Sequence, residues 1–262
     1  MASGGSNAPG WDIKKLQRLI VTSATYRQSS RITAAALRRD PDNRLLGRAS
    51  IYRLDAETIR DNALAIGGLL TRAVGGPSVR PYQPAGLWEQ VAVGGNYTSQ
   101  TYVESTGPDL YRRGLYTYWK RSLPSPALVA FDAPTRELCT ACRSRTNTPV
   151  QALVLLNDPT YVEAARGLAE RVLREAGPDV DAQLTHAFRL CTSRPPAEVE
   201  LAVLRRVVNE QCVLFERTAQ DAAALIRVGA STPDALVDQR RLAAWTAVAN
   251  LLLNLNETIT RR

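Results

Sequence analysis

Two helix starts lie close together in the stretch TPVQALVLLNDPTYVEAARGLAERVLREAG (148–177). Each start places a capping residue directly before a proline, at Thr148-Pro149 and at Asp158-Pro159. Thr and Asp side chains cap helix N-termini, and proline is favoured at the first helical position. Gln151 adds the spacing of a capping box to the first start. The stretch therefore predicts a short apolar helix over 149–156 and a longer helix over 159–175.

Helical periodicity extends on both sides of this stretch. Upstream, the sequence predicts an amphipathic helix over 12–28, a short helical piece over 43–48, and a helix that is capped by Asp55 and stopped by Gly75-Gly76-Pro77. Downstream, it predicts a helix over 180–191, one long helix over 197–228, and a last helix that begins at Thr232-Pro233. We expect the last two helices to form a long antiparallel pair.

Residues 77–147 differ from the rest, because they are rich in Pro, Gly, Tyr and Trp and lose the helical period. The segment LYRRGLYTYWKR (110–121) has the aromatic content of a strand and is a candidate half of a small β-hairpin. A long irregular segment inside a compact domain is often functional. The predicted fold is mainly α: a single helical domain over 11–262 with this irregular arginine- and aromatic-rich layer, preceded by a disordered segment over 1–10.

The charge balance is basic, with 33 Lys+Arg against 25 Asp+Glu and a net charge of +8. Three of the basic residues are lysines (14, 15 and 120), so 33 − 3 leaves 30 arginines. The arginines are scattered and mostly lie close to Asp or Glu, unlike the dense basic runs of nucleic-acid binders. We therefore do not expect a nucleic-acid partner, although a cytosolic nucleic-acid binder is kept as the third function hypothesis. No apolar run approaches the length of a transmembrane helix, and residues 1–12 lack the pattern of a signal peptide.

The scarcity of certain residue types excludes much cofactor chemistry. His186 is the one histidine, so a site with several His ligands is excluded within this chain. Cys139 and Cys142 form a CxxC, whose spacing suits a zinc knuckle or a redox dithiol. Arg143 follows where covalent haem attachment needs His, so that use is excluded. We predict no cofactor or metal in the chain and keep the two cysteines as weak metal candidates, with two incidental thiols as the simpler interpretation.

The densest group of polar residues lies in FDAPTRELCTACRSRTNT (131–148) together with LLNDP (155–159), which adds Asn157 and Asp158. Three interpretations stay open. The leading one is scaffolding, in which arginines tie the irregular segment to the helices. The second is binding of an anionic ligand through charge-assisted bonds, with the candidates Arg136, Arg143, Arg145, Asn147, Arg112 and Arg113. The third is acid–base catalysis by paired carboxylates, with the candidates Asp132, Glu137 and Asp61. Asp158 is expected to be a helix cap.

The aromatic residues of the irregular layer suggest a polysaccharide as a further possible ligand. They are Trp88, Tyr97, Tyr102, Tyr111, Tyr116, Tyr118 and Trp119. Aromatic side chains can stack on sugar rings, but in a proline-rich loop layer they more often pack on the helices beneath.

Many separate motifs resemble one known family in the same order along the chain. They are IVTSATYRQSS, NRLLGR, RLDAETIRDNAL, GGPSVRPYQP, LYRRGLYTYWKR, FDAPTRELC, RTNTPVQALVLLNDPTYVEAAR and AWTAVANLLLNLNETITR. The family is domain-of-unknown-function family 1553, the C-terminal domain of planctomycete PSD-type proteins. The resemblance runs from about Trp11 to the end of the chain.

The resemblance implies a context rather than an activity. In typical members this domain follows a cytochrome-c-like domain that carries CxxCH, so haem c is expected in a missing upstream domain. The expected location of the full-length protein is the periplasm or cell envelope. The leading hypothesis is an accessory domain that binds a ligand or a partner, including the parent protein's upstream domains. The runner-up is an enzyme, with polysaccharide as its candidate substrate; whether the chain is an enzyme stays open.

Overall fold

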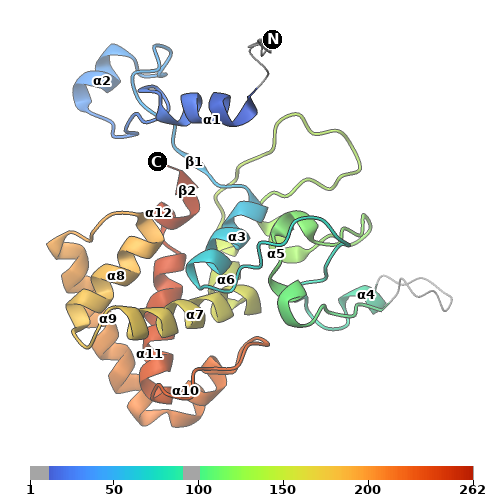
Figure 1. The fold of residues 1–262 in the computed structure, drawn as a ribbon, viewed down its shortest axis with the longest axis vertical. Coiled ribbons are helices and arrows are strands. Elements are labelled where there is room, and N and C mark those ends of the chain that lie inside the picture. The colour runs from blue at the N-terminus through green and yellow to red at the C-terminus, as the bar shows by residue number, and fades with distance from the viewer. Residues whose placement is uncertain (1–11, 91–100, 262) are drawn as a thin grey trace, which may run out of the picture. The chain divides into compact units, whose positions relative to one another are not determined.

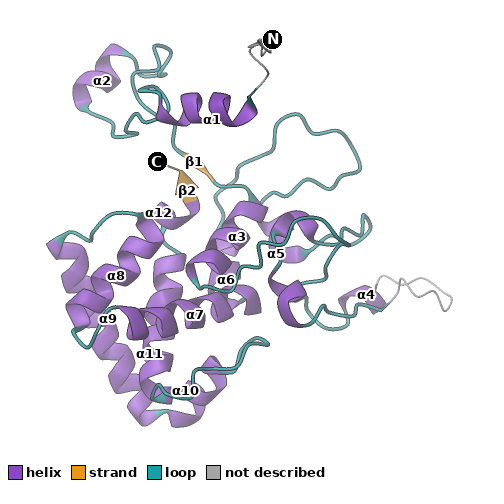
Figure 2. Cartoon of the chain, in the orientation of Figure 1, coloured by secondary structure: helices purple, strands orange, loops and turns teal. Residues whose placement is uncertain are grey.

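The computed structural model describes residues 12–90 and 101–261, and the predicted disordered segment over 1–10 lies outside them. The contacts divide the chain into two compact units. The first, which we call the N-terminal unit, runs to Tyr52 and includes the last three residues; the second, the helical unit, comprises Arg53–Ile259. The sequence-based expectation of one domain over 11–262 stays a prediction. The fold is mainly helical, as predicted (Figure 2).

The N-terminal unit contains helices α1 (Ile13–Thr22) and α2 (Ala34–Arg39). Helix α1 ends earlier than the predicted 28, and none of its residues is buried. The predicted helical piece over 43–48 does not form, because Asn43 and Leu46 have positive φ angles of 54° and 52°. Such angles belong to turns rather than to right-handed helices.

The strands that the structure describes are short, with two residues each. β1 (Tyr52–Arg53) pairs with β2 (Thr260–Arg261) in a two-stranded sheet (Figure 2). Within the N-terminal unit, Arg261 donates to the Tyr52 hydroxyl at 2.9 Å and covers the Tyr26 ring at 4.6 Å. The final residues thus return to the first part of the chain.

The helical unit is built around α11 (Gln239–Leu253), drawn in red in Figure 1. This helix contacts α7 (Pro159–Glu175), α8 (Val180–Thr192), α9 (Glu198–Arg217) and α10 (Ala219–Ile226). The smaller α12 (Asn256–Ile259) follows it. Leu242, Ala243, Ala244, Val248 and Leu252 of α11 are fully buried. The core therefore lies along α11, where the apolar faces of its neighbours meet.

Two downstream helices differ from the sequence-based expectation. The helix predicted over 197–228 breaks at Thr218, which leaves the helical region at φ −121° and ψ 61° and separates α9 from α10. Helix α11 begins at Gln239 rather than at 232, because the Asp238 side chain caps it by accepting from Arg241 N at 2.9 Å. The predicted pairing of the last long helices holds, since α9 and α11 pack together.

Helix α3 (Ala56–Ile66) ends nine residues before the predicted stop at Gly75, at a close contact with α7. A Cβ added at Gly67 would lie 2.5 Å from the Ala164 carbonyl oxygen, and one added at Gly167 would lie 2.4 Å from the Gly67 oxygen. The two backbones approach this closely because both positions lack a side chain. The approach fixes α3 against α7.

The irregular layer contains α4 (Leu87–Gln90), α5 (Pro126–Ala130) and two 3₁₀ turns, and α6 (Pro149–Asn157) follows it. The turns are Gly107–Tyr111 and Gly114–Tyr116, so the segment considered as half of a β-hairpin forms turns instead. Within 77–90 and 101–147 the pairing that the structure describes is a bridge between Val79 and Thr117. Side chains rather than a ladder must therefore hold this layer.

Buried arginines supply much of that support. Arg60 of α3 donates to the carbonyls of Leu110 and Arg112 at 2.8 and 2.7 Å. Arg112 in turn donates to the carbonyls of Pro77, at 2.9 Å, and Gly75, and stacks 4.0 Å above the Tyr116 ring. Buried carbonyls need hydrogen-bond partners, and a guanidinium can satisfy two at once. The arginines therefore replace the backbone ladder that the irregular layer lacks.

Candidate functional site

One residue joins α6 to α7 and positions the candidate site. Asp158 is the C-cap of α6, where its N–H donates to Val154 O at 2.9 Å. It is also the N-cap of α7, where its Oδ1 accepts from Thr160 N at 2.9 Å. Because Pro159 follows, Asp158 is held in an extended conformation with φ −68° and ψ 132°. The predicted capping role of Asp158 is confirmed.

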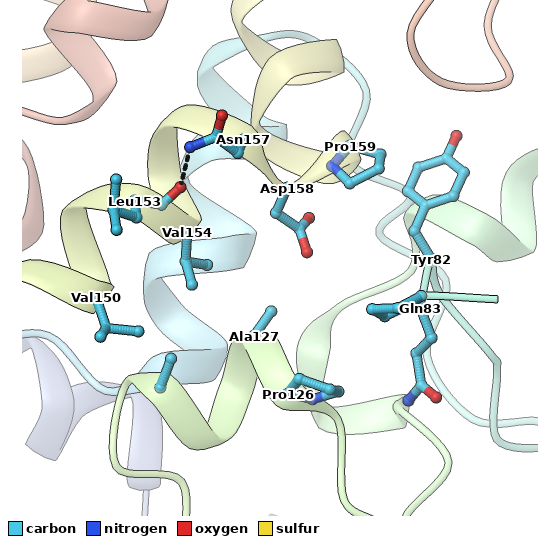
Figure 3. A pocket seen from close by; sticks show the side chains of 12 residues that line it. Tyr82, Gln83, Pro126, Ala127, Val150, Leu153, Val154, Asn157, Asp158 and Pro159 are labelled. Atoms are coloured by element: carbon cyan, nitrogen blue, oxygen red, sulfur yellow. Dashed lines mark hydrogen bonds between the residues drawn. The ribbon is translucent and has the colours of Figure 1, made fainter. Parts of the chain in front are cut away.

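The Asp158 carboxyl group points into a cavity of about 510 Å³ (Figure 3). This volume lies within the ~300–1,000 Å³ typical of small-molecule sites. The apolar lining is Pro84, Pro126, Ala127, Ala130, Val150, Leu153, Val154 and Pro159. The polar lining is Tyr82, Gln83, Asn157 and Asp158. We call this cavity the Asp158 pocket.

Helix α6 contributes an apolar wall that the described residues of the helical unit leave uncovered. Its sequence PVQALVLLN is nearly all apolar, yet Leu155 is its one apolar side chain in the core. Val150 and Leu153, which line the pocket, are each 56 % exposed. Apolar side chains that gather at the rim of a cavity mark binding surfaces. The exposed face of α6 is therefore a feature that packing within this unit does not explain.

The polar side chains of the pocket differ in the hydrogen bonds that they make within the protein. Asn157 donates to Leu153 O at 2.8 Å, and Gln83 accepts from the Trp88 indole at 3.0 Å. Burial raises the pKa of the Asp158 carboxyl group, although the bonds from Thr160 and the positive field of Arg60 act in the opposite direction. Asp158 is thus a carboxyl group in a largely apolar cavity, with its charge only partly compensated.

Tyr82 connects the pocket to a buried polar cluster. Its ring lines the pocket, and its hydroxyl donates to Glu163 Oε2 at 2.8 Å and accepts from Ala230 N at 2.7 Å. Burial, followed by the bond to Glu163, raises the pKa of Tyr82 strongly. Tyr82 is therefore a neutral hydrogen-bond donor at any physiological pH.

Glu163 lies at the centre of this cluster and is fully buried. Its Oε1 accepts from the Tyr111 hydroxyl at 2.8 Å, from Ser231 N at 2.7 Å and from Ser231 Oγ at 2.6 Å. Arg166 lies 3.6 Å from the same oxygen and donates to the carbonyls of Ile226 and Ser231. A buried carboxylate is tolerated when it is paired and hydrogen-bonded. The cluster fastens the segment between α10 and α11 to α7.

The structure places Asp132 in a structural ion pair. Its Oδ2 lies 2.5 Å from Arg53 Nη2, and both oxygens accept from Thr146 Oγ1. The Thr146 N–H also donates to Asp132 at 2.8 Å. Arg53 itself is buried and donates to Phe131 O at 3.2 Å. These bonds link β1 to the loop that leads into α6.

Asp61 contacts the predicted ligand-binding residue Arg113 at the turn after Arg112. It accepts from Gly114 N at 2.6 Å and lies 3.5 Å from Arg113 Nε. Burial raises the pKa of the Asp61 carboxyl group, and the Gly114 bond acts against that shift. Arg112 is committed to the carbonyls named above. The structure therefore brings Asp61 and Arg113 together, in contacts that hold the 3₁₀ turn Gly114–Tyr116 on α3, while Arg112 bonds elsewhere.

The remaining predicted residues do not gather in one site. Arg143 pairs with Glu57 at 2.7 Å, and Arg136 stacks 4.7 Å above the Trp119 ring. Glu137, Asn147 and Arg145 are exposed, and Arg145 makes an interaction of its own. Of the aromatic group, Trp88 contacts Tyr102 at 5.0 Å and Tyr118 at 5.9 Å, while Tyr97 lies outside the described residues.

The cysteines offer no metal centre in the part of the chain that the structure describes. Cys139 and Cys142 are both free and exposed. Among the described residues, no three His, Cys, Asp or Glu side chains gather as a metal site would require. No helix over 12–90 and 101–261 is both long and apolar enough to cross a bilayer.

Sequence reasoning missed the pocket and the Glu163 cluster. The signal for the pocket was present in the nearly all-apolar α6, which is too short and too uniform to present a single buried stripe. The cluster gave a misleading signal, because Glu163, Arg166 and Glu170 share one helix face and charged faces are usually solvated. The burial of Glu163 and Arg166 depends on partners far away in the sequence.

Comparison with known proteins gives a family and no closer relative. Residues 7–208 match the family PSD1, described as a protein of unknown function (DUF1553). No curated protein matches the chain. No solved structure matches it either. Since the match spans most of the 262 residues and agrees with the motifs, this chain belongs to the DUF1553 family.

Proposed function

We propose that the helical unit is a ligand-binding accessory domain and that its site is the Asp158 pocket. The observation that carries this proposal is the exposed apolar face of α6 at the rim of a cavity of about 510 Å³. Exposing Val150 and Leu153 costs free energy, at about 25 cal/mol per Å² of apolar surface. An apolar ligand in the pocket recovers that free energy by covering them.

The pocket suits a small molecule with a sizeable apolar part. Eight of its twelve described lining residues are apolar or proline. Three short elements frame it: the Tyr82–Pro84 segment, α5 and α6 (Figure 3). Two of them are anchored on the core, since Tyr82 bonds to Glu163 and α5 packs on α3 and α6. A pocket whose walls are fixed in this way loses little conformational entropy on binding.

An uncharged fluorescent probe tests this function. N-pentyl dansylamide has an apolar ring system and an alkyl chain, and its fluorescence rises when it enters an apolar site. We expect saturable binding that Ala127→Trp abolishes, because an indole at this position fills the cavity. The matched control is Ala224→Trp on the exposed side of α10, outside the pocket lining, which should bind as the wild type does. The absence of saturable binding to the wild-type protein, or equal binding by both variants, would refute the proposal.

We also propose a larger context, on the strength of the family membership. The chain serves as the C-terminal accessory domain of an envelope-associated protein with a c-type cytochrome domain upstream, which is also its partner. Haem belongs to that upstream domain, because here the CxxC is followed by Arg143. Reading the coding DNA upstream of the Met1 codon tests this context. An in-frame CxxCH with an export signal supports it, and a nearby in-frame stop codon contradicts it.

The other ligands and activities considered from the sequence receive less support. Asp132, Arg112 and Arg143 make bonds within the protein that an anionic ligand or an acid–base reaction would have to break. Breaking a buried ion pair costs about 3–5 kcal/mol of free energy. We therefore place ligand binding in the pocket rather than among the arginines.

A further inference from the structure

We infer that the ligand of the Asp158 pocket carries an alkylammonium group, which its Asp158 carboxylate binds while the apolar remainder lies against α5 and α6. This inference rests on the proposed function and adds the chemical class of the ligand. It follows from the charges that line the cavity and from the direction of the Asp158 side chain.

The lining has one sign of charge. Asp158 is the one acidic residue among the twelve described lining residues, and none of them is Lys, Arg or His. Its carboxyl group points into the middle of the cavity, between Tyr82 and Ala127 (Figure 3). The other polar side chains already have partners within the protein, as described above for Asn157 and Gln83. Among the described lining residues, a ligand therefore meets the Asp158 carboxylate as its one charged contact.

The charge of Arg60 acts on that carboxylate, but the terminal nitrogens of Arg60 bond elsewhere. Arg60 lines a small adjoining cavity together with Asp158, but its two terminal nitrogens donate to the carbonyls of Leu110 and Arg112. Asp61 lies 4.0 Å from Arg60 and takes up part of its charge. Asp158 itself is held by bonds from Thr160, whose N–H donates to Oδ1 at 2.9 Å. An ammonium group in the pocket would therefore complete the pairing of Asp158, whereas an anion would meet a like charge.

The apolar walls strengthen this pairing. A hydrogen bond between an ammonium and a carboxylate is stronger than a neutral one, and it gains further when water is excluded. The alkyl chain of the ligand would supply the exclusion by covering Val150 and Leu153. An alkylammonium ligand thus pairs with the Asp158 carboxylate and covers the exposed side chains of Val150 and Leu153 at the same time.

Two probes that differ in one group test the inference. Dansylcadaverine is N-pentyl dansylamide with a terminal primary amine, so the pair isolates the charge. We expect dansylcadaverine to bind the wild-type protein about tenfold more tightly than its uncharged analogue. In Asp158→Asn this preference should vanish, while binding of the uncharged probe persists. Asn is also a good N-cap, so α7 keeps its start.

The possible outcomes separate the two proposals. Equal binding of both probes to the wild-type protein would overturn the ammonium inference and leave the ligand-binding function in place. A tenfold preference that survives in Asp158→Asn would also overturn it, because the carboxylate would not be its origin. Failure of both probes to bind would overturn the proposed function together with the inference.

Discussion

Gly229 offers the most direct test of the buried Glu163 cluster. Its φ of +94° is strained for any residue with a side chain, and a Cβ built there would lie 2.2 Å from Glu163 Cδ and 2.5 and 2.6 Å from the two carboxylate oxygens. The carboxylate cannot retreat, because Tyr82, Tyr111 and both donors of Ser231 hold it from the other sides. Gly229→Ala must therefore displace either the loop or the carboxylate.

The expected cost is the sum of three contributions. The positive φ costs about 1 kcal/mol, overpacking costs ~1–3 kcal/mol, and loss of one hydrogen bond to a charged group costs ~1.5–3 kcal/mol. Gly229→Ala should thus lower the free energy of unfolding by about 3.5–7 kcal/mol. Gly177→Ala is the matched control, since Gly177 has a φ of +73° and no atom lies within 4 Å of its added Cβ. It should lose only the conformational contribution of about 1 kcal/mol.

Urea unfolding followed by far-UV circular dichroism measures both variants against the wild type. The difference between Gly229→Ala and Gly177→Ala isolates the clash with Glu163. If the two variants lose the same free energy, Glu163 is free to move and the cluster is not the rigid fastening described above.

Three further predictions concern other parts of the helical unit. Asp132→Asn should lower the free energy of unfolding by ~3 kcal/mol because it leaves buried Arg53 without its counter-charge. Glu137→Gln, at an exposed position, is the control and should change the free energy of unfolding by less than about 0.5 kcal/mol. Equal losses in urea unfolding would contradict the ion pair. The bond from Arg194, and then that from Ala197 N, lowers the pKa of Glu200 from 4.5 to about 2. Because the folded-state pKa is the lower one, this pair stabilises the fold above about pH 4.5 and loses its effect as the pH falls toward 2. The loss caused by Glu200→Gln should therefore shrink over this interval, and a constant loss would refute it. Finally, the exposed Cys139 and Cys142 should react rapidly with a disulfide reagent in the folded protein. Cys191 should stay unreactive, because burial raises the pKa of its thiol to about 12. A fast reaction that survives the double Cys139→Ser, Cys142→Ser substitution would contradict this prediction.

Local signals explain what could be predicted from the sequence. The starts of α6 and α7 follow from Thr148-Pro149 and Asp158-Pro159, where cap and proline act within a few residues. The mainly helical fold follows in the same way from periodicity. The errors at 43–48 and at Thr218 also have local causes, since each depends on backbone angles that side-chain type restricts only weakly.

The site depends on contacts that no local pattern reveals. Glu163 meets Tyr82 and Ser231, which lie 81 and 68 residues away in the sequence. Asp132 was a catalytic candidate because it lies in a stretch rich in polar residues. Its partner Arg53 lies 79 residues away in the sequence, and their ion pair gives Asp132 a structural role. The exposed face of α6 became visible only when the packing of its neighbours was known. The charged and apolar residues could be counted from the sequence, but the residues that contact them could not be predicted from it.

The arginine ties of the irregular layer have a consequence for sequence variation within the family. A guanidinium that donates to a main-chain carbonyl makes no demand on the side chain of the accepting residue. Leu110 and Gly75, which accept through their backbone, can therefore be exchanged wherever space and φ allow, while Arg60 and Arg112 cannot. Relatives should keep these arginines and vary freely around them. The layer can thus acquire new surface chemistry without losing its shape.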